Sequence, residues 1–333
     1  MRYNKEVSII IPSRNEERFI GPCLDSIISN DWPKDRLEIL IVDGKSEDKT
    51  LEIVKRYIEK YPSIKLFENP KKITPSALNI GIKNSEGEFI IRMDAHSRCQ
   101  KDYISKCIRY LKEYKADNVG GIIKTTPSDK GLFARSIAYC LSSFFGAGGA
   151  YFRTGADSPK WVDTVFGGCY KREVFDKIGF FNENLERTQD LEFNLRLKRS
   201  GGKILLAPDI VSYYYPKSKI GEFFIHNFKD GVWITYPFKF IKLPFRIRHY
   251  IPLIFVIVLL SFFKLGIFFP FFLKLFFAVF LLYLLFDFLF SVYASLKEKD
   301  IRYIFSLAVV FPLRHIGYGL GSVWGIIKLI LRL

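Results

Sequence analysis

Cysteine is scarce in this 333-residue chain, and the few cysteines carry no pairing or metal-binding pattern. Their number is odd and none falls in a C-x-x-C spacing: Cys23, Cys99, Cys107, Cys140 and Cys169. This usage excludes a disulfide-stapled scaffold and a cysteine zinc centre. We therefore expect reduced thiols in core positions, as in a reducing compartment.

Acidic residues are fewer than basic ones. The chain has 34 Asp and Glu against 50 Lys and Arg, which gives a net charge of +16. Three partners suit such a charge: nucleic acid, an anionic membrane surface or a phosphorylated small molecule. The sequence has no zinc-finger, helix-turn-helix or RNA-binding signature, so we expect no nucleic acid. It also lacks a signal-peptide pattern at its start, and we expect the N-terminal part to stay in the cytoplasm.

Long apolar runs occur only toward the C-terminus, at about residues 250–269, 273–295 and 302–327. A membrane-spanning helix needs roughly 20 apolar residues, so these runs predict a membrane domain of two to three helices at 250–333. The third run contains Pro312, Arg314 and His315, and it either spans the membrane or lies in a re-entrant or interfacial position.

Small and basic residues around these runs add two expectations. Four glycines of the third run would allow close helix packing: Gly317, Gly319, Gly321 and Gly325. Basic residues precede the first run: Lys239, Lys242, Arg246 and Arg248. By the positive-inside rule they place that flank in the cytoplasm, which makes the chain a multi-pass cell-membrane protein with a cytoplasmic N-terminal domain. Anionic membrane lipids are then natural partners.

Before residue 220 the pattern alternates between strands and helices. The expected strands are 7–11, 38–42, 64–67, 89–93 and 119–123. The expected helices are 17–29, 49–60, 76–84 and 102–114. This rhythm predicts an α/β domain at 1–220 with a mostly parallel, Rossmann-like sheet covered on both faces. Residues 221–249 are aromatic, basic and amphipathic, and form an interface segment before the membrane domain.

Two acidic positions follow apolar runs at the carboxyl ends of expected strands. Asp43 follows residues 37–42, and Asp94 and His96 follow residues 89–93. In open α/β sheets ligands bind beyond these strand ends. Asp94 and His96 are two residues apart, so they can face the same way and hold a divalent cation, Mn²⁺ or Mg²⁺, against a diphosphate. A transferase needs this arrangement when a nucleoside diphosphate leaves.

Several segments in order carry a family resemblance. Residues 7–17, 41–50 and 92–96 resemble the successive motifs of family 2 glycosyltransferases with the GT-A fold. Four further segments resemble the membrane-anchored succinoglycan-biosynthesis glucosyltransferases, the ExoA-like subgroup: 118–121, 162–168, 187–194 and 201–204. The resemblance covers nearly all of the soluble part, and the ordered set is more specific than any one motif.

The resemblance implies a role for particular residues. It implies nucleotide-binding residues at Pro12, Arg14, Glu16, Asp43 and Asp94. It implies metal ligands at Asp94 and His96, where His96 replaces the second Asp of the usual motif and suits Mn²⁺ better than Mg²⁺. It implies the catalytic general base at Asp190, with Gln189 in place of the more common Glu.

A further set of residues resembles the acceptor or diphosphate region: Gly167, Gly168, Gln189, His226, Lys229 and Trp233. His226 departs from the Gln that the subgroup tends to have. Gly167 and Gly168 either let the acceptor approach or serve as tight backbone contacts. Trp233 is either an interfacial anchor or a substrate platform.

These observations predict an enzyme, a metal-dependent inverting hexosyltransferase. We expect it to move a sugar such as glucose from a UDP-sugar to a polyprenyl-diphosphate-linked saccharide in cell-surface polysaccharide or glycan assembly. One alternative is transfer to polyprenyl phosphate itself, as in dolichyl-phosphate mannose synthases, and another is a non-catalytic membrane scaffold. A processive synthase is disfavoured because the chain has no Q-x-x-R-W motif and few helices. The sequence specifies neither the sugar nor an oligomeric state.

Overall fold

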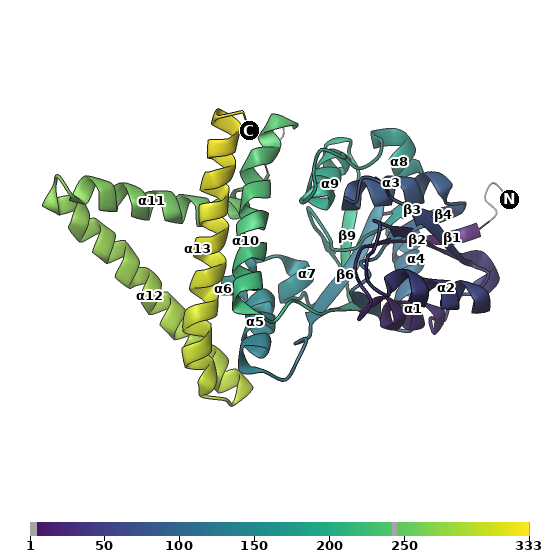
Figure 1. Cartoon of the computed structure of the whole chain (residues 1–333), viewed down its shortest axis with the longest axis horizontal. Coiled ribbons are helices and arrows are strands. Elements are labelled where there is room, and N and C mark those ends of the chain that lie inside the picture. Colours follow the sequence, from purple (N-terminus) through teal and green to yellow (C-terminus); the bar gives the residue numbers. More distant parts are fainter. Residues whose placement is uncertain (1–4, 242–244, 333) are drawn as a thin grey trace. The chain divides into compact units, whose positions relative to one another are not determined.

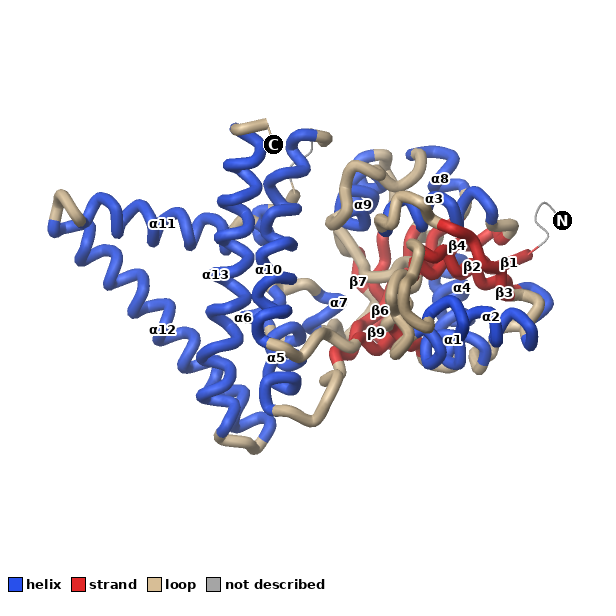
Figure 2. Tube along the Cα trace, in the orientation of Figure 1, coloured by secondary structure: helices blue, strands red, loops and turns tan. Residues whose placement is uncertain are grey.

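The computed structural model describes residues 5–241 and 245–332, so Lys242 lies outside the described residues. The chain forms two compact units. The α/β unit comprises Met1–Lys124 and Thr154–Tyr214, and the helical unit comprises Thr125–Arg153 and Tyr215–Leu333. Figure 2 shows that the strands belong to the first of these units and that the second is built from helices.

Four parallel strands form one half of the sheet in the α/β unit, in the order β3-β2-β1-β4. They are β1 (Lys5–Ser13), β2 (Leu37–Asp43), β3 (Ile64–Glu68) and β4 (Gly87–Arg92). Each coincides with an expected strand to within a few residues. Ser13 pairs in register with Asp43, so β1 and β2 end side by side.

The other half of the sheet is antiparallel and continues from β4 in the order β8-β6-β9-β5, with β7 paired to β9. Its strands are β5 (Ser97–Cys99), β6 (Asn118–Thr125), β7 (Lys160–Trp161), β8 (Cys169–Lys171) and β9 (Ile204–Tyr214). The predicted α/β class is therefore confirmed, and the sheet is mixed. The fifth expected strand, β6, does not extend the parallel run, because the short antiparallel β8 lies between it and β4.

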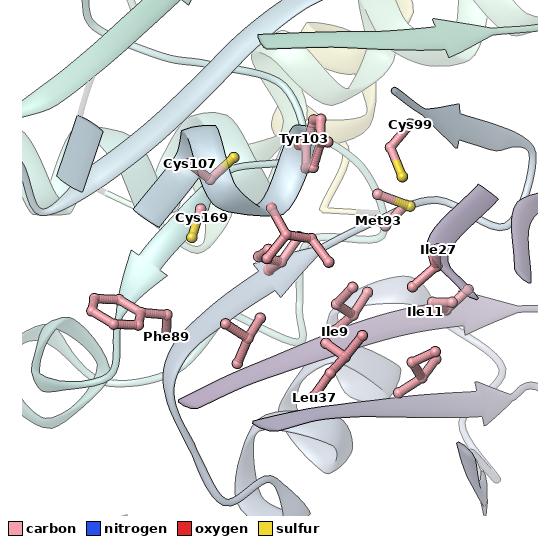
Figure 3. Close-up of a cluster of buried hydrophobic side chains, with 14 of the residues drawn as sticks. Ile9, Ile11, Ile27, Leu37, Phe89, Met93, Cys99, Tyr103, Cys107 and Cys169 are labelled. Carbon is pink, nitrogen blue, oxygen red and sulfur yellow. The ribbon is translucent and has the colours of Figure 1, made fainter. Parts of the chain in front are cut away.

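One face of the sheet packs on helices α1 (Ile20–Ile28), α2 (Thr50–Lys60) and α4 (Tyr103–Glu113) (Figure 1). Side chains point alternately to the two faces of a strand, so the odd-numbered residues of β1, β2 and β4 gather here. Figure 3 shows Ile9, Ile11, Leu37 and Phe89 beside Ile27 and Cys107 from the helices. All five cysteines of the chain are free and buried, in the core positions that the sequence predicts.

The other face packs on α3 (Thr74–Asn84), α8 (Glu173–Ile178) and α9 (Gln189–Arg199). Gly81 of α3 lies so close to β1 that a Cβ atom there would be 2.4 Å from Ile10 Cγ2. Phe193 of α9 packs against Tyr170 and Phe181, with ring centroids 5.4 and 4.5 Å away. This aromatic packing fixes the start of α9 relative to β8. A 3₁₀ turn, η1 (Lys34–Arg36), precedes β2.

In its described residues, the helical unit contains three short helices and four longer ones. The short helices are α5 (Leu132–Ser142), α6 (Phe144–Ala147) and α7 (Tyr151–Thr154), the last at the boundary with the α/β unit. The longer helices are α10 (Ile220–Thr235), α11 (Ile251–Gly266), α12 (Pro270–Glu298) and α13 (Arg302–Ile330). Two 3₁₀ turns, η2 (Tyr236–Lys239) and η3 (Ile247–His249), follow α10.

Helices α10 and α13 lie side by side over much of their lengths (Figure 1). The glycines predicted to permit close packing lie at this contact. A Cβ atom on Gly321 would be 1.9 Å from the backbone oxygen of Phe228, and one on Gly231 would be 1.9 Å from that of Tyr318. Arg314 ties the helices further, because it donates to Asn227 Oδ1 at 2.7 Å and to the backbone oxygen of Gly146.

Among the described residues, α12 and α13 are the two helices long and apolar enough to cross a membrane. The burial pattern of α12 is inverted, since its buried residues are Asp287, Ser291, Ala294 and Ser295, whereas its phenylalanines and leucines are largely exposed. A water-soluble protein rarely exposes so large an apolar surface. The two helices therefore indicate a membrane anchor. With 16 residues, α11 is roughly 24 Å long, less than the roughly 30 Å of a bilayer core.

The two compact units differ in one respect from the sequence-based division of the chain at residue 220. Residues 125–153 belong with the C-terminal helices, although they precede β7 to β9. Ser136 of α5 shares a 2.7 Å hydrogen bond with Ser306 of α13, and Arg135 lies 3.2 Å from Asp300. Contacts between residues so distant in sequence leave no local pattern that could predict them.

Candidate active site

Asp43 closes the end of β2 and organises the loop that follows it. Its Oδ2 accepts a hydrogen bond from the backbone N–H of Ser46 at 2.8 Å, and its Oδ1 accepts one from Ser46 Oγ at 2.5 Å. The backbone N–H of Gly44 donates to Ser13 of β1 at 2.8 Å. The Asp43 carboxylate is thus fixed beside the carboxyl end of β1, where a ligand of the sheet would lie.

The loop after β1 contacts the loop after β2. Asn15 has a positive φ of 56°, and its backbone N–H donates to Ser46 Oγ at 2.9 Å. Its Oδ1 accepts from the backbone N–H of Glu47 at 2.8 Å. Arg14 packs on Gly44, where a Cβ atom would lie 3.4 Å from Arg14 Cβ, while its side chain remains exposed. The structure therefore brings Pro12, Arg14 and Asp43 together at one end of the sheet.

His96 and Glu16 form a hydrogen-bonded pair beyond β4 and β1. His96 Nδ1 lies 2.9 Å from Glu16 Oε1, and its ring packs edge-on against Tyr214 at 5.4 Å. An ionised carboxylate can only accept, so Nδ1 carries the proton and donates, and Nε2 is the ring nitrogen that could bind a metal. Burial lowers the pKa of His96, but the Glu16 hydrogen bond and the charge of Asp94 outweigh it, and the net pKa is raised above 6.5.

Arg92, the last residue of β4, joins two carboxylates. Its Nη2 donates to Asp94 Oδ1 at 2.8 Å, and its Nη1 lies 2.8 Å from Asp190 Oδ2. The guanidinium also lies over the ring of Phe166, 5.5 Å from the centroid. Its side chain is 7% exposed. Burial lowers the pKa of Arg92, but Asp190 and Asp94 more than offset it, so the net pKa is raised and the group stays charged.

Asp190 is the second residue of α9, where the partial positive charge of the helix N-terminus favours a carboxylate. The preceding Thr188 has a φ of 59°, a strained conformation for a β-branched residue. Asp190 Oδ1 is buried and has no hydrogen-bond partner among residues 5–241 and 245–332. Burial raises the pKa of Asp190, Arg92 opposes this and Asp94 adds to it, and the net pKa is raised above 3.8.

A network of buried amides fixes the helix turn that follows Asp190. Asn194 lies one turn after Asp190 on α9, accepts from Asn118 Nδ2 at 2.9 Å and donates to Thr164 Oγ1 at 2.9 Å.

Gly167 and Gly168 lie against the end of β4. The carbonyl of Gly168 accepts a hydrogen bond from the backbone N–H of Arg92 at 3.1 Å. A Cβ atom on Gly167, whose φ is 72°, would lie 3.2 Å from the Arg92 carbonyl. The two glycines therefore make tight backbone contacts with β4.

Asp94 and His96 fit a divalent cation as two of its ligands. Neither Asp94 Oδ2 nor His96 Nε2 has a hydrogen-bond partner in the described part of the chain, and a carboxylate oxygen with an imidazole nitrogen suits Mn²⁺. No group of three or more His, Cys, Asp or Glu side chains that could hold a metal occurs among the described residues. A cation here would need further ligands from a bound molecule, such as diphosphate oxygens.

The remaining predicted residues divide between the two units. Gln189 is buried as the first residue of α9, in the α/β unit. His226, Lys229 and Trp233 lie on α10, in the helical unit. Lys229 is exposed, His226 Nε2 lies 3.3 Å from Asp230, and Trp233 packs edge-on against Tyr236 at 5.7 Å.

Sequence reasoning assigned no role to Arg92, Phe166, Tyr214 or Asn194. For Arg92 a signal exists, because a charged residue at the end of the apolar run 89–93 needs a buried partner. Tyr214 and Phe166 have no such signal. They reach the site only through β9 and the loop before β8, and the first of these elements was not predicted.

Comparison with known proteins agrees with this geometry. Residues 8–179 match the family profile described as Glycosyl transferase family 2. A dolichyl N-acetyl-α-D-glucosaminyl phosphate 3-β-D-2,3-diacetamido-2,3-dideoxy-β-D-glucuronosyltransferase of Methanococcus voltae is 34% identical over 68% of this chain and 71% of its own length. The succinoglycan biosynthesis protein ExoA of Rhizobium meliloti is 28% identical over 67% of each chain.

A solved structure shows the same fold. The mannosyltransferase PcManGT from Pyrobaculum calidifontis, described in complex with GDP-Man and Mn²⁺, is similar with a TM-score of 0.62 at 20% identity. The similarity covers 97% of this chain and 88% of that one. The predicted resemblance is thereby confirmed: this chain belongs to glycosyl transferase family 2.

Proposed function

We propose that the chain is a metal-dependent inverting hexosyltransferase that moves a sugar from a UDP-sugar to a polyprenyl-diphosphate-linked saccharide. The observation that carries this proposal is the Asp94–Arg92–Asp190 cluster. It joins a carboxylate suited to a metal and diphosphate with a carboxylate whose Oδ1 is buried and has no hydrogen-bond partner in the described residues. An inverting displacement needs one carboxylate for each of these tasks.

The reaction follows from these positions. Asp190 Oδ1 accepts the proton of the acceptor hydroxyl, whose oxygen forms the new bond to the anomeric carbon. The bond from that carbon to the β-phosphate oxygen breaks, and UDP leaves from the opposite face. A cation held by Asp94 and His96 would offset the negative charge that develops on the diphosphate. Asp43 and the loop of Pro12, Arg14 and Glu16 would hold the nucleoside at the ends of β1 and β2.

The acceptor proposal draws on the relatives and on the anchor. The name of the Methanococcus relative describes transfer to a dolichyl-linked sugar phosphate. A lipid-linked saccharide presents its head group at the membrane surface, where the α12 and α13 anchor would keep the enzyme. Gly167, Gly168, Gln189, His226, Lys229 and Trp233 remain proposed acceptor or diphosphate residues.

The proposed topology is multi-pass with a cytoplasmic catalytic domain. Basic residues flank the pair α11 and α12 at both ends, with Arg246 and Arg248 before α11 and Lys297, Lys299 and Arg302 after the apolar part of α12. By the positive-inside rule both flanks would face the cytoplasm. The α/β unit precedes the first flank and would lie on the same side.

Transfer assays test the proposal. Purified protein in detergent is incubated with Mn²⁺, a panel of UDP- and GDP-sugars and extracted membrane lipids, and wild type is compared with Asp190→Asn. We expect turnover of a UDP-sugar in wild type and a loss of about 10²- to 10⁴-fold in the variant, with donor binding retained. A lengthened lipid-linked saccharide supports the proposed acceptor, whereas a monosaccharide phospholipid supports transfer to polyprenyl phosphate. Absence of turnover and of nucleotide binding would refute the enzyme proposal.

A further inference from the structure

Arg92 holds an unusual position for a buried charge. Arg92 is the last residue of β4, and the three residues before it, Phe89, Ile90 and Ile91, are apolar. Its guanidinium lies between Asp94 and Asp190, with a nitrogen 2.8 Å from an oxygen of each. Removing an arginine from water is costly unless its charge is well paired. Packing of the strand alone would not require a positive charge at this position. The buried charge therefore indicates a function for the guanidinium.

The pairing within the cluster is incomplete. Nη2 makes an aligned hydrogen bond to Asp94, whereas Nη1 lies near Asp190 without the alignment of a hydrogen bond, and Nε is buried without a partner among the described residues. One guanidinium is thus shared by two carboxylates. Phe166 covers it on one side, and the Gly168 carbonyl fixes its backbone.

We propose that Arg92 is a positioning residue that couples donor binding to the base: it holds Asp190 ionised and oriented, and it releases Asp94 to the cation of the bound donor. This inference rests on the proposed role of Asp190. Asp94 Oδ1 accepts from Arg92. If Asp94 bound a cation instead, the guanidinium would be left to Asp190 alone. The base would then be paired most fully when a donor is present.

The groups that face Asp190 make Arg92 decisive for its ionisation. Arg92 contributes positive charge from β4, Asp94 contributes negative charge from the segment after β4, and the neutral hydroxyl of Tyr170 faces it from β8. Removing the guanidinium leaves the negative charge of Asp94 unopposed there. The Asp190 carboxylate would then bind its proton at higher pH.

The experiment compares Arg92→Gln, Arg92→Lys, Asp190→Asn and the double variant Arg92→Gln/Asp190→Asn with wild type. The matched control is Arg109→Gln on α4, an exposed arginine that pairs with Asp209. Each full-length protein is measured for kcat against pH and for binding of UDP with Mn²⁺. Thermal unfolding and circular dichroism identify any variant that does not fold.

We expect Arg92→Gln to lower kcat by about 10²-fold and to move the acid limb of the kcat profile to higher pH by about one unit. Arg92→Lys keeps the positive charge, so the acid limb of its kcat profile should lie close to the pH of the wild-type limb. The double variant should be no slower than Asp190→Asn alone, because both changes remove the same function. Arg109→Gln should behave as wild type.

Four results would overturn the inference. An unmoved acid limb in folded Arg92→Gln would leave Arg92 a purely structural role. If Arg92→Gln does not fold, a folded Arg92→Lys whose acid limb moves by about one pH unit despite the retained charge would overturn the inference. A double variant slower by the product of the two single effects would show independent functions. Wild-type turnover in Asp190→Asn would remove the base assignment itself, whereas an inactive Asp190→Asn beside a normal Arg92→Gln would overturn only the coupling.

Discussion

At the scale of single residues, the carboxylate of Asp190 combines burial with an oxygen that has no partner in the described chain. In its proposed role as the general base, Asp190 works only while it is ionised. Burial raises its pKa above 3.8 even though Arg92 opposes the change. The folded enzyme therefore binds this proton at higher pH than an ordinary aspartate would.

This gives a prediction for the pH dependence of wild type. As pH falls through the raised pKa, Asp190 takes up a proton and kcat should decline with a slope of one proton, on an acid limb above pH 3.8. The measurement is single-turnover transfer at saturating donor across pH, with circular dichroism to confirm folding at each point. A profile that stays flat down to about pH 4 in folded protein would contradict the assignment of Asp190 as base.

Glu16 gives a second prediction at this scale. Its carboxylate accepts from His96 Nδ1 and so leaves Nε2 as the atom that would bind the proposed metal. Partners of this kind typically contribute about 10- to 100-fold in metal affinity. Glu16→Gln should therefore weaken Mn²⁺ binding in the presence of UDP by about that factor, measured by electron paramagnetic resonance of free Mn²⁺. Glu17→Gln, on the neighbouring exposed residue, is the control, and equal affinities in all three proteins would contradict the pairing.

At the scale of elements, the α10–α13 contact depends on glycine. A Cβ atom on Gly321 would lie 1.9 Å from the Phe228 backbone oxygen, whereas one on Gly221 of α10 meets nothing within 4 Å. Gly321→Ala should thus destabilise the helical unit by about 1–3 kcal/mol despite the better helix propensity of alanine. Gly221→Ala should be neutral or slightly stabilising. Thermal unfolding in detergent tests the pair, and equal melting temperatures would contradict the packing.

The sequence predicted well the strands and helices in which apolar residues recur at regular spacing. Strands β1 to β4 and helices α1 to α4 are long enough for alternating or helical apolar patterns, and they occur close to the expected positions. Strands β5, β7 and β8 have two or three residues each, too few for any period. In β9, Pro208 interrupts the pattern. Apart from β6, which coincides with the expected strand 119–123, the strands of the antiparallel half were missed for these reasons.

In the candidate site too, local sequence patterns revealed some residues, and contacts between distant residues were not predicted. Asp43, Asp94 and Asp190 lie at or near the ends of elements within recognisable motifs, so the sequence could mark them as candidates. Arg92 lies inside one of those motifs, yet its contact with Asp190 joins β4 to α9 across almost a hundred residues. Such pairings depend on tertiary structure and cannot be read from local sequence.

At the scale of the whole molecule, the chain enters the helical unit at Thr125, returns to the α/β unit at Thr154 and leaves it again after Tyr214. A fragment of residues 1–214 would keep α5 without α13, whose Ser306 and Asp300 contact Ser136 and Arg135. The apolar residues of α5, such as Ile137 and Leu141, would become exposed.

We therefore predict that residues 1–214 aggregate when expressed alone. The matched control replaces residues 125–153 of this fragment with a Gly/Ser linker and should remain monomeric with an α/β circular dichroism spectrum. Size-exclusion chromatography with light scattering distinguishes the two. A monomeric, folded 1–214 fragment would show that α5 does not need the C-terminal helices.

The most direct test of the whole account separates binding from turnover on the two carboxylates that Arg92 joins. UDP-sugar binding with Mn²⁺ and single-turnover transfer are measured on wild type, Asp94→Asn and Asp190→Asn. The account predicts that Asp94→Asn loses metal-dependent donor binding, and that Asp190→Asn binds donor as wild type does but transfers about 10²- to 10⁴-fold more slowly. Equal loss of binding in both variants, or normal transfer by Asp190→Asn, would contradict it.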